Sequence, residues 1–446
     1  MAWREMSGSL KPSESPVRRT PRSDVRNLLR STAALIVFGL IGSWTSETAA
    51  QQPTWGASLF APSLEAGREI DAGRALPLTP FYLQASRERA AKPGTLVRAE
   101  PANNFALPPG VTATRILYHT MTANGTDTLA SGVVLVPYGQ PPVGGWPLLA
   151  WSHGTSGVAM LCAPSLMKSL FYDWEGLYMY LTSGYAVVAT DYAGLGTNGR
   201  HAYLDIASNA TDVVNSVPAA HAAVPSLSRQ WLVVGHSQGG LSSLGVAQLE
   251  ATIQDPDFLG TVALAGASDL EDAVGSILKA RLPVLNGLLA FWIYGVKTVY
   301  PQFEPRDVLT SKALAIYENS VAKGCSAASA AFTAVPTDEM LSPGWRENRY
   351  VMKFLARNQP GTQPTYGPIL LLGGGDDILF TDAAGQRVFK RICAAGGQAQ
   401  RKAYPGLGHD AVVYGSMKDQ LGWIAQRFGG KTLPNDCAPK VSGLNQ

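Results

Sequence analysis

The sequence predicts an α/β fold in which a mostly parallel central sheet carries helices on both faces and an inserted helical cap. From residue 147 onward, short apolar runs typical of strands alternate with stretches of helical spacing, as in parallel sheets buried on both faces. The alternation stops at residues 268–367, which contain apolar helical stretches and no clear parallel strand. Such an insertion favours a cap over one end of the sheet. A plain helical layer that buttresses the sheet is the alternative.

Composition sets the class of protein. The chain has 446 residues, of which 46% are hydrophobic and 15% are charged, so it is globular and long enough to bury a sizeable core. The formal net charge is only +3, and much of the basic excess lies between Arg18 and Arg30. Because no basic stripe remains elsewhere, nucleic acid is not an expected partner.

Residues 1–50 have the pattern of a signal peptide. A basic stretch ends at Arg30, an apolar segment covers residues 33–42, and small residues at 48–50 would allow cleavage before Gln51. The apolar segment is too short for a comfortable membrane span. The pattern therefore predicts a secreted or periplasmic protein, with an uncleaved N-terminal membrane anchor as the competing interpretation.

The exported part contains four cysteines. An even number in an oxidising compartment favours two disulfides, for which three pairings are possible, and buried free thiols are the alternative. Their wide spacing, without a C-x-x-C motif, argues against a metal site. The cysteines are Cys162, Cys325, Cys393 and Cys437.

Residues 51–93 are predicted to form an irregular N-terminal arm, because prolines break any long element there. Residues 94–267 and 368–446 are predicted to form the core, and 268–367 the cap or lid. Three antiparallel edge strands are expected at 96–99, 112–120 and 129–136. The other strands are expected at 147–152, 185–192, 231–234, 261–266, 368–372 and 400–404, and helices at 202–223 and 412–428. Cap helices are expected at 273–280, 284–294, 308–323 and 344–357, and the apolar residues 291–294 favour a surface that meets an apolar substrate.

The most informative stretch is a short strand, Trp231 to Val234, that runs into Gly235-His236-Ser237-Gln238-Gly239 and then into a helical segment. In this G-x-S-x-G context the serine sits on a sharp, strained turn, and the helix N-terminus faces the place where an oxyanion would form. The pattern predicts Ser237 as a catalytic nucleophile. A merely tight turn is the alternative.

A serine nucleophile needs a base and an orienting carboxylate, which follow this motif in the order acid and then histidine. Of the six histidines, only His409 follows Ser237 in the chain, so it is the predicted base. The acid should follow the strand at 368–372, where Asp376 and Asp377 are adjacent. Neighbouring side chains point in different directions, so only one can reach His409; we favour Asp376, with Asp377 as the alternative acid. The other aspartate would cap the helix near Asp382 or bond within the loop.

The oxyanion hole should combine the backbone N–H of Gln238 with a second one from the loop after residue 152, supplied by Thr155 or Gly154. Residues 191–196 either wall the same pocket or form a tight turn at a strand end.

Together these residues resemble the secretory lipase family of the α/β-hydrolase superfamily, over about residues 94–437. The resemblance implies a helical cap inserted before the acid strand, hydrolysis of carboxylic esters and lipids, and no cofactor. It also implies that the cystines pair first with second and third with fourth, as Cys162–Cys325 and Cys393–Cys437. The sequence departs from the family pattern at Asp377, beside Asp376, and at Phe380, where the family often has proline. The motifs are Ser152-His153-Gly154-Thr155, Cys162-Ala163-Pro164-Ser165, Asp191-Tyr192-Ala193-Gly194-Leu195-Gly196, Gly235 to Gly239, Gly373 to Asp377 and Gly408-His409.

The expected function is a secreted serine ester hydrolase, a lipase or carboxylesterase that works through an acyl-enzyme. Its expected partner is a small-molecule or lipid ester. A lipid ester would be bound at a lipid–water interface. A serine peptidase or amidase is one alternative, although the cap lacks clustered charges to hold a peptide terminus. A non-catalytic binding protein is another, although it would be expected to have lost Ser237 or His409. Acyl chain length and oligomeric state stay open.

Overall fold

The computed structural model describes residues 60–83, 90–171 and 175–438. The chain divides into two units, residues 1–50 and 51–446, and the description below concerns the second. The predicted signal peptide lies outside the described residues. Among the helices in the described part of the chain, none combines the length and apolar character needed to cross a membrane.

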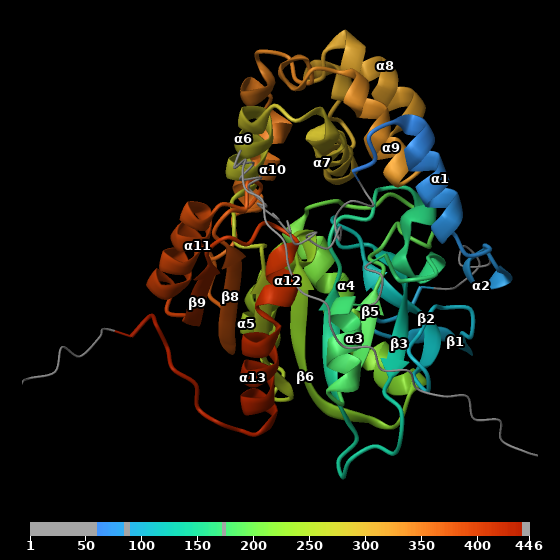
Figure 1. The fold of residues 1–446 in the computed structure, drawn as a ribbon, viewed down its shortest axis with the longest axis vertical. Helices are drawn as coiled ribbons and strands as arrows, with labels where there is room; N and C mark the ends of the chain where they lie inside the picture. Colours follow the sequence, from blue (N-terminus) through green and yellow to red (C-terminus); the bar gives the residue numbers. More distant parts are fainter. Residues whose placement is uncertain (1–59, 84–89, 172–174, 439–446) are drawn as a thin grey trace, which may run out of the picture. The chain divides into compact units, whose positions relative to one another are not determined.

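A nine-stranded sheet forms the centre of the fold, in the order β1-β2-β3-β5-β4-β6-β7-β8-β9 (Figure 1). Strands β1 to β3 pair antiparallel with one another, β3 pairs antiparallel with β5, and the remaining neighbours are parallel. The predicted mostly parallel sheet with an antiparallel edge is therefore confirmed. The strands are β1 (Leu96–Pro101), β2 (Thr112–Met121), β3 (Asp127–Val136), β4 (Trp146–Ser152), β5 (Ala186–Thr190), β6 (Leu227–His236), β7 (Phe258–Leu264), β8 (Pro368–Gly374) and β9 (Gln398–Tyr404).

Helices cover both faces of the sheet, as predicted. Along β4, Leu148 and Ala150 pack on one face, in the same cluster as residues of α4 and α5, whereas Leu149 and Trp151 pack on the other with α3 and α13. Strands β5 and β7 are buried along their whole length, which explains their continuous apolar sequences. The flanking helices are α3 (Glu175–Thr182), α4 (Ile206–Ala223), α5 (Gln238–Ile253), α11 (Asp382–Ala394), α12 (Ala411–Gly415) and α13 (Met417–Phe428).

The cap lies between β7 and β8. Residues 268–367, all of which the structure describes, contain helices and no strand beyond an isolated bridge between Leu309 and Leu341. Every cap helix expected from the sequence is present with shifted ends, and the short α9 was not expected. Figure 1 shows these helices gathered beyond one end of the sheet. They are α6 (Leu270–Ala280), α7 (Asn286–Val299), α8 (Ser311–Ser320), α9 (Ser326–Ala330) and α10 (Arg349–Arg357).

The arm is partly helical, so the expectation of an irregular segment is wrong for its described residues. Helix α1 (Leu64–Arg74) starts at Ser63, whose side chain accepts from the N–H of Ala66, and α2 covers Pro80–Leu83. The prolines flank α1 and do not interrupt it. The carboxylate of Asp71 accepts hydrogen bonds from the first backbone N–H groups of α9, which attaches the arm to the cap.

Both cystines have the pairing that the family resemblance implies. Cys162 is bonded to Cys325, and Cys393 to Cys437. All four cysteines are therefore paired, which rules out the free-thiol alternative. The first cystine joins a loop of the core after β4 to the start of α9 in the cap, and the second joins α11 to the C-terminal segment.

Candidate active site

The turn between β6 and α5 holds Ser237 in a strained conformation. Its backbone has φ 57° and ψ −119°, a region that non-glycine residues rarely occupy. The flanking glycines are required by close backbone approach. A Cβ at Gly239 would lie 1.8 Å from the carbonyl oxygen of Ser152, and one at Gly235 would lie 2.3 Å from that of Gly239. The sequence G-x-S-x-G is therefore what this turn needs in order to form.

Three side chains that follow the ends of three strands form a continuous hydrogen-bonded chain. Nε2 of His409, in the loop after β9, lies 2.8 Å from Oγ of Ser237. Nδ1 of the same ring lies 2.8 Å from Oδ2 of Asp377, in the loop after β8. An imidazole held in this way by a carboxylate can take a proton from the serine hydroxyl and later return it.

The aspartate in contact with His409 is Asp377, so the expectation that Asp376 reaches the histidine is wrong. Asp377 is buried, and its Oδ1 accepts from the N–H groups of Leu379 and Phe380 at 2.8 and 2.9 Å. These bonds turn its side chain into the protein, while Asp376 is exposed. The side chain of Asp377 thus forms a recurrent type of turn with the N–H groups two and three residues later, which the sequence of two adjacent aspartates does not reveal.

The electrostatics of the pair suit a general base. Burial opposes the charge on His409, but the ion pair and hydrogen bond with Asp377 outweigh it and raise the pKa of His409. For Asp377 burial favours the neutral acid, yet the bonds from His409 and from two backbone N–H groups hold its pKa below its usual value. The carboxylate is thus ionised wherever the imidazole titrates.

The expected oxyanion donors lie beside Ser237. Gln238 is the first residue of α5, and the first N–H groups of a helix have no partner within it. Thr155 lines the same pocket as Ser237 and Gln238, and its hydroxyl is 2.7 Å from that of Tyr203. Among the described residues that line this pocket Gly154 is absent. Of the three expected donors, Gln238 and Thr155 therefore line the pocket of Ser237 and stay the candidates.

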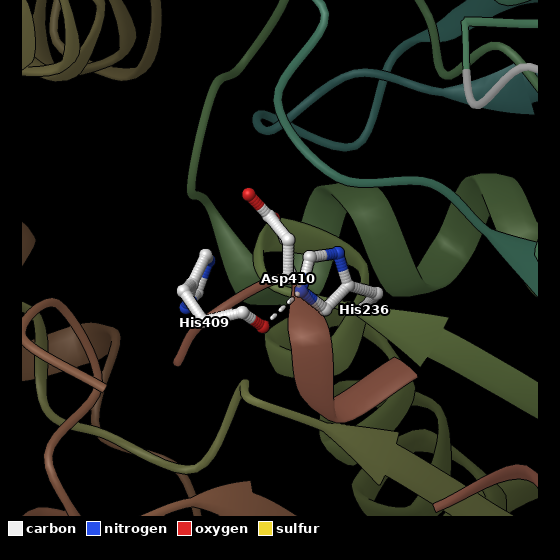
Figure 2. A group of neighbouring side chains, drawn as sticks. All are labelled: His236, His409 and Asp410. Carbon is white, nitrogen blue, oxygen red and sulfur yellow. Dashed lines mark hydrogen bonds and ion pairs between the residues drawn. The ribbon is translucent and has the colours of Figure 1, made fainter. Parts of the chain in front are cut away.

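A second histidine, which the sequence analysis did not single out, contacts the loop of His409. Figure 2 shows His236, His409 and Asp410 side by side. The Nε2–H of His236 donates to the carbonyl oxygen of His409 at 3.0 Å, and the same nitrogen is 3.8 Å from Asp410. Burial and the neighbouring His409 lower the pKa of His236 to about 4, so it is neutral near pH 7. His236, which precedes Ser237, thus connects the end of β6 to the loop that carries His409.

These same three residues are, within the described part of the chain, a group close enough to hold a metal ion, with ligand atoms within 4.8 Å of one another. Both ring nitrogens of His409 already contact other side chains, Asp377 and Ser237. An ion bound there would have to break that chain. The cluster therefore belongs to the Ser237 site and is not assigned as a metal centre.

An apolar pocket opens at Ser237 between core and cap. Trp292 is the one member of the apolar stretch 291–294 among its lining residues; Phe291 and Ile293 are buried inside the cap. None of residues 191–196 is among the described lining residues, and Asp191 instead accepts hydrogen bonds from Ser131 and Ser165 in the core, so that segment is a buried turn. The cap contributes Leu270, Ala273, Val274, Ile277, Leu288, Leu289 and Trp292, and the rest of the chain Phe60, Thr155, Phe171, Tyr203, Leu204, His236, Ser237, Gln238, Leu379, Phe380, His409 and Asp410.

A mostly parallel sheet with a strained serine between β6 and α5, and a helical insertion before β8, defines an α/β-hydrolase. The model of the secretory lipase family matches residues 167–436, which is more than half of the chain. The chain belongs to this family and is a carboxylic-ester hydrolase.

Solved structures share this fold. Lipase A of Candida antarctica in its closed state has 15% sequence identity and a TM-score of 0.66, over 82% of this chain and 90% of that one. The rice cell wall degrading esterase LipA of Xanthomonas oryzae has 19% identity and a TM-score of 0.60, over 76% of this chain and 98% of that one. At such identities the likeness shows the fold alone. No curated protein matches the sequence.

Proposed function

We propose that this ester hydrolase is an exported lipase or carboxylesterase in which Ser237, His409 and Asp377 form the catalytic triad. The observation that carries the proposal is the chain of two 2.8 Å contacts, from Asp377 to His409 and from His409 to Ser237. Each role needs the residue type found there: a hydroxyl to attack, an imidazole to move a proton and a carboxylate to orient the imidazole.

In the proposed reaction, Oγ of Ser237 attacks the ester carbonyl carbon while Nε2 of His409 takes its proton. The negative oxygen that forms accepts hydrogen bonds from the N–H groups of Gln238 and Thr155. When the tetrahedral intermediate collapses, His409 gives the proton to the departing alkoxide, so the alcohol leaves and the acyl group stays on Ser237. Water then attacks this ester while His409 takes its proton, and His409 returns that proton to Oγ of Ser237 as the acid is released.

The lining of the pocket supports an acyl or lipid ester as substrate. Leu288, Leu289 and Trp292 of α7 and Val274 and Ile277 of α6 offer apolar contacts to a hydrocarbon chain. The two related structures carry the names of a lipase and an esterase. The peptidase alternative is not favoured, because the chain belongs to a lipase family.

Export is part of the proposal. Membership of a secretory family and two cystines suit an oxidising compartment outside the cytosol. We further propose that residues 1–50 act as the signal peptide. N-terminal sequencing of the exported protein should then begin at Gln51, and retention of the leader would indicate an anchor instead.

The test of the function is hydrolysis of 4-nitrophenyl esters of increasing chain length and of an emulsified triglyceride, with Ser237→Ala as the matched variant. We expect turnover by the wild type and its loss in the variant, whose fold should be unchanged by removal of one hydroxyl. Activity on long chains and emulsion supports a lipase, and activity confined to short esters a carboxylesterase. Turnover that persists in the variant would exclude Ser237 as nucleophile.

A further inference from the structure

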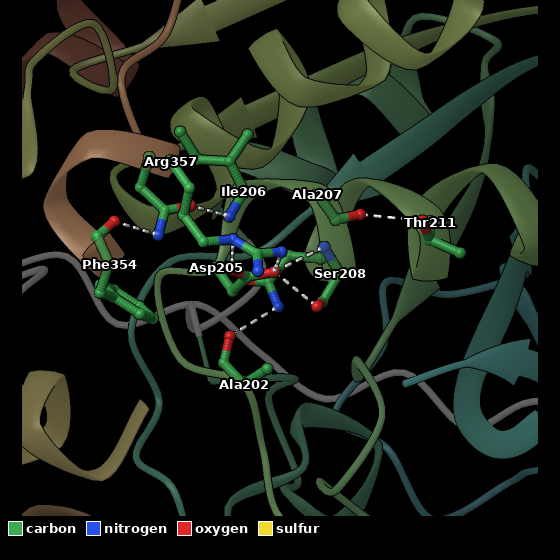
Figure 3. A network of polar contacts seen from close by, with 10 residues as sticks. Ala202, Asp205, Ile206, Ala207, Ser208, Thr211, Phe354 and Arg357 are labelled. Atoms are coloured by element: carbon green, nitrogen blue, oxygen red, sulfur yellow. Dashed lines mark hydrogen bonds and ion pairs between the residues drawn. The ribbon is translucent and has the colours of Figure 1, made fainter. Parts of the chain in front are cut away.

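The last residues of α10 attach the cap to the start of α4 in the core. Nε of Arg357 lies 2.9 Å from Oδ2 of Asp205, and its Nη2 donates to Oδ1 at 3.3 Å. The next residue, Asn358, accepts the backbone N–H of Ile206 at 2.8 Å. Figure 3 shows Arg357 reaching from the cap helix to Asp205. The carboxylate is fully buried and the arginine side chain is about one-third exposed, so solvent screens this ion pair only in part.

Asp205 in turn organises the first turn of α4, of which it is the N-cap residue. Its Oδ1 accepts from the N–H of Ser208 at 3.1 Å and from the hydroxyl of Ser208 at 2.6 Å. Its backbone carbonyl accepts from the N–H of Asn209 at 3.0 Å. Arg357 is therefore connected to Asn209 through one buried carboxylate and one helical turn.

Asn209 holds the side chain of Gln238. Nε2 of Gln238 donates to Oδ1 of Asn209 at 3.1 Å and lies 3.0 Å from Nε2 of His201. The other ring nitrogen of His201 faces the carbonyl oxygen of Ala193 at 3.3 Å, which requires a proton there and leaves Nε2 as the acceptor. Burial lowers the pKa of His201 to about 3, so the ring is neutral. Both amide hydrogens of Gln238 are thus used.

Gln238 directly follows Ser237 and carries the proposed oxyanion N–H. Its side chain is buried, and its contacts to Asn209 and His201 join the first turn of α5 to these two residues. Helices α4 and α5 also pack closely, because a Cβ at Gly245 would lie 2.5 Å from Cγ2 of Ile206. The first residue of α4 therefore packs tightly against the middle of α5, so the two helices can hardly shift independently of each other.

We propose that Arg357, Asp205 and Asn209 are positioning residues. They link the contact between the cap and the core at α10 to the backbone N–H of Gln238. They form one buried polar path from α10 to the first residue of α5. The inference rests on the proposed function, because it needs that N–H to stabilise the oxyanion. A donor works only within about 2.7–3.1 Å of the oxyanion, and losing one costs about 100- to 1000-fold in kcat, so a small displacement costs part of that factor.

The test compares Arg357→Gln, Asn209→Ala and the double variant with a matched control, Arg387→Gln. Arg387 of α11 pairs with Asp272 of α6, so the control also removes an ion pair between core and cap, but neither residue belongs to the path from Arg357 to Gln238. The measurements are kcat and KM for a short soluble ester, inhibition by phenylboronic acid and the thermal midpoint. The boronic acid forms a tetrahedral adduct on Ser237 and so reports on the oxyanion donors.

We expect each single variant to lower kcat about 5- to 30-fold and to weaken boronate inhibition by a similar factor, with KM nearly unchanged. The double variant should lose little more than the worse single variant, because both act on the same donor. Arg357→Lys should restore part of kcat, and Arg387→Gln should leave kcat and boronate inhibition unchanged.

Full kcat in both single variants, independent effects in the double variant, or an equal loss in Arg387→Gln would overturn the inference. Loss of kcat without loss of boronate affinity would also overturn it. Ser237→Ala separates the two proposals: activity that survives in it defeats the proposed function, whereas an inactive Ser237→Ala beside fully active Arg357→Gln and Asn209→Ala defeats only the link to the cap.

Discussion

Oδ2 of Asp377 lies 2.8 Å from Nδ1 of His409, while the other oxygen of the same carboxylate accepts two backbone N–H groups. The carboxylate is therefore fixed on both sides, and it fixes the tautomer and the plane of the imidazole ring. With Nδ1 protonated toward Asp377, Nε2 is left to accept the proton of Ser237. Asp376, one residue earlier, is exposed.

The two neighbouring aspartates allow a matched comparison. Asp377→Asn keeps the shape of the side chain but removes its charge, so the imidazole loses its orientation and the imidazolium its stabilisation. We expect kcat on a short ester to fall about 10⁴-fold, as when other triad aspartates are replaced. Asp376→Asn should keep kcat close to the wild-type value. A large loss in Asp376→Asn beside a nearly active Asp377→Asn would reverse the assignment.

The pH profile should report the pKa of His409, which Asp377 and, more weakly, Asp410 hold above the usual 6.5. The base must be neutral, so kcat/KM is expected to be lost as the pH falls through this raised pKa. Asp410→Asn removes one of the negative charges that raise it, so the acid limb of the profile should move to lower pH. Asp376→Asn serves as the control with no shift. A shift to higher pH in Asp410→Asn would contradict this origin of the pKa.

The need for glycine in the turn that carries Ser237 can be tested by measuring the stability of glycine variants. In Gly239→Ala the new methyl group would meet the carbonyl of Ser152, which is backbone and cannot turn away, whereas a Cβ at Gly373 has nothing within 4 Å. We expect Gly239→Ala to lower the free energy of unfolding by about 3 kcal/mol or more and to abolish activity. Gly373→Ala should change the unfolding midpoint little. Equal midpoints in the two variants would mean that the turn relaxes without strain.

The sequence predicts a feature of this protein when residues close together in the chain determine that feature. Ser237 lies in a local motif whose glycines and flanking elements specify the turn, and chain order leaves only His409 as its base. The acid could not be decided in this way, because two adjacent residues share the same sequence context. It is the hydrogen bonds from Leu379 and Phe380 that select Asp377.

Two polar contacts between residues far apart in the chain could not be predicted from their local sequence. Helix α1 is held by hydrogen bonds between Asp71 and the start of α9, which lies more than 250 residues further along the chain. The ion pair of Arg357 with Asp205 likewise joins residues 152 positions apart. Composition and periodicity describe which faces of an element are apolar, but they do not say which polar side chains meet across a domain.

Removal of the two cystines should lower the stability by different amounts, because they join different parts of the chain. Cys162–Cys325 links core and cap across 163 residues, and Cys393–Cys437 links two segments of the core across 44. Replacing a pair by serines should cost about 2–4 kcal/mol of stability, and loop-closure entropy makes the longer loop worth about 1 kcal/mol more.

We therefore expect the double variant Cys162→Ser/Cys325→Ser to lower the unfolding midpoint further than Cys393→Ser/Cys437→Ser. It should also be the variant that loses activity below its midpoint, because α9 lies in the cap that lines the pocket of Ser237. Denaturant unfolding followed alongside ester hydrolysis checks both points. If the second pair proves more costly, local packing around α11 contributes more stability than the closure of the longer loop.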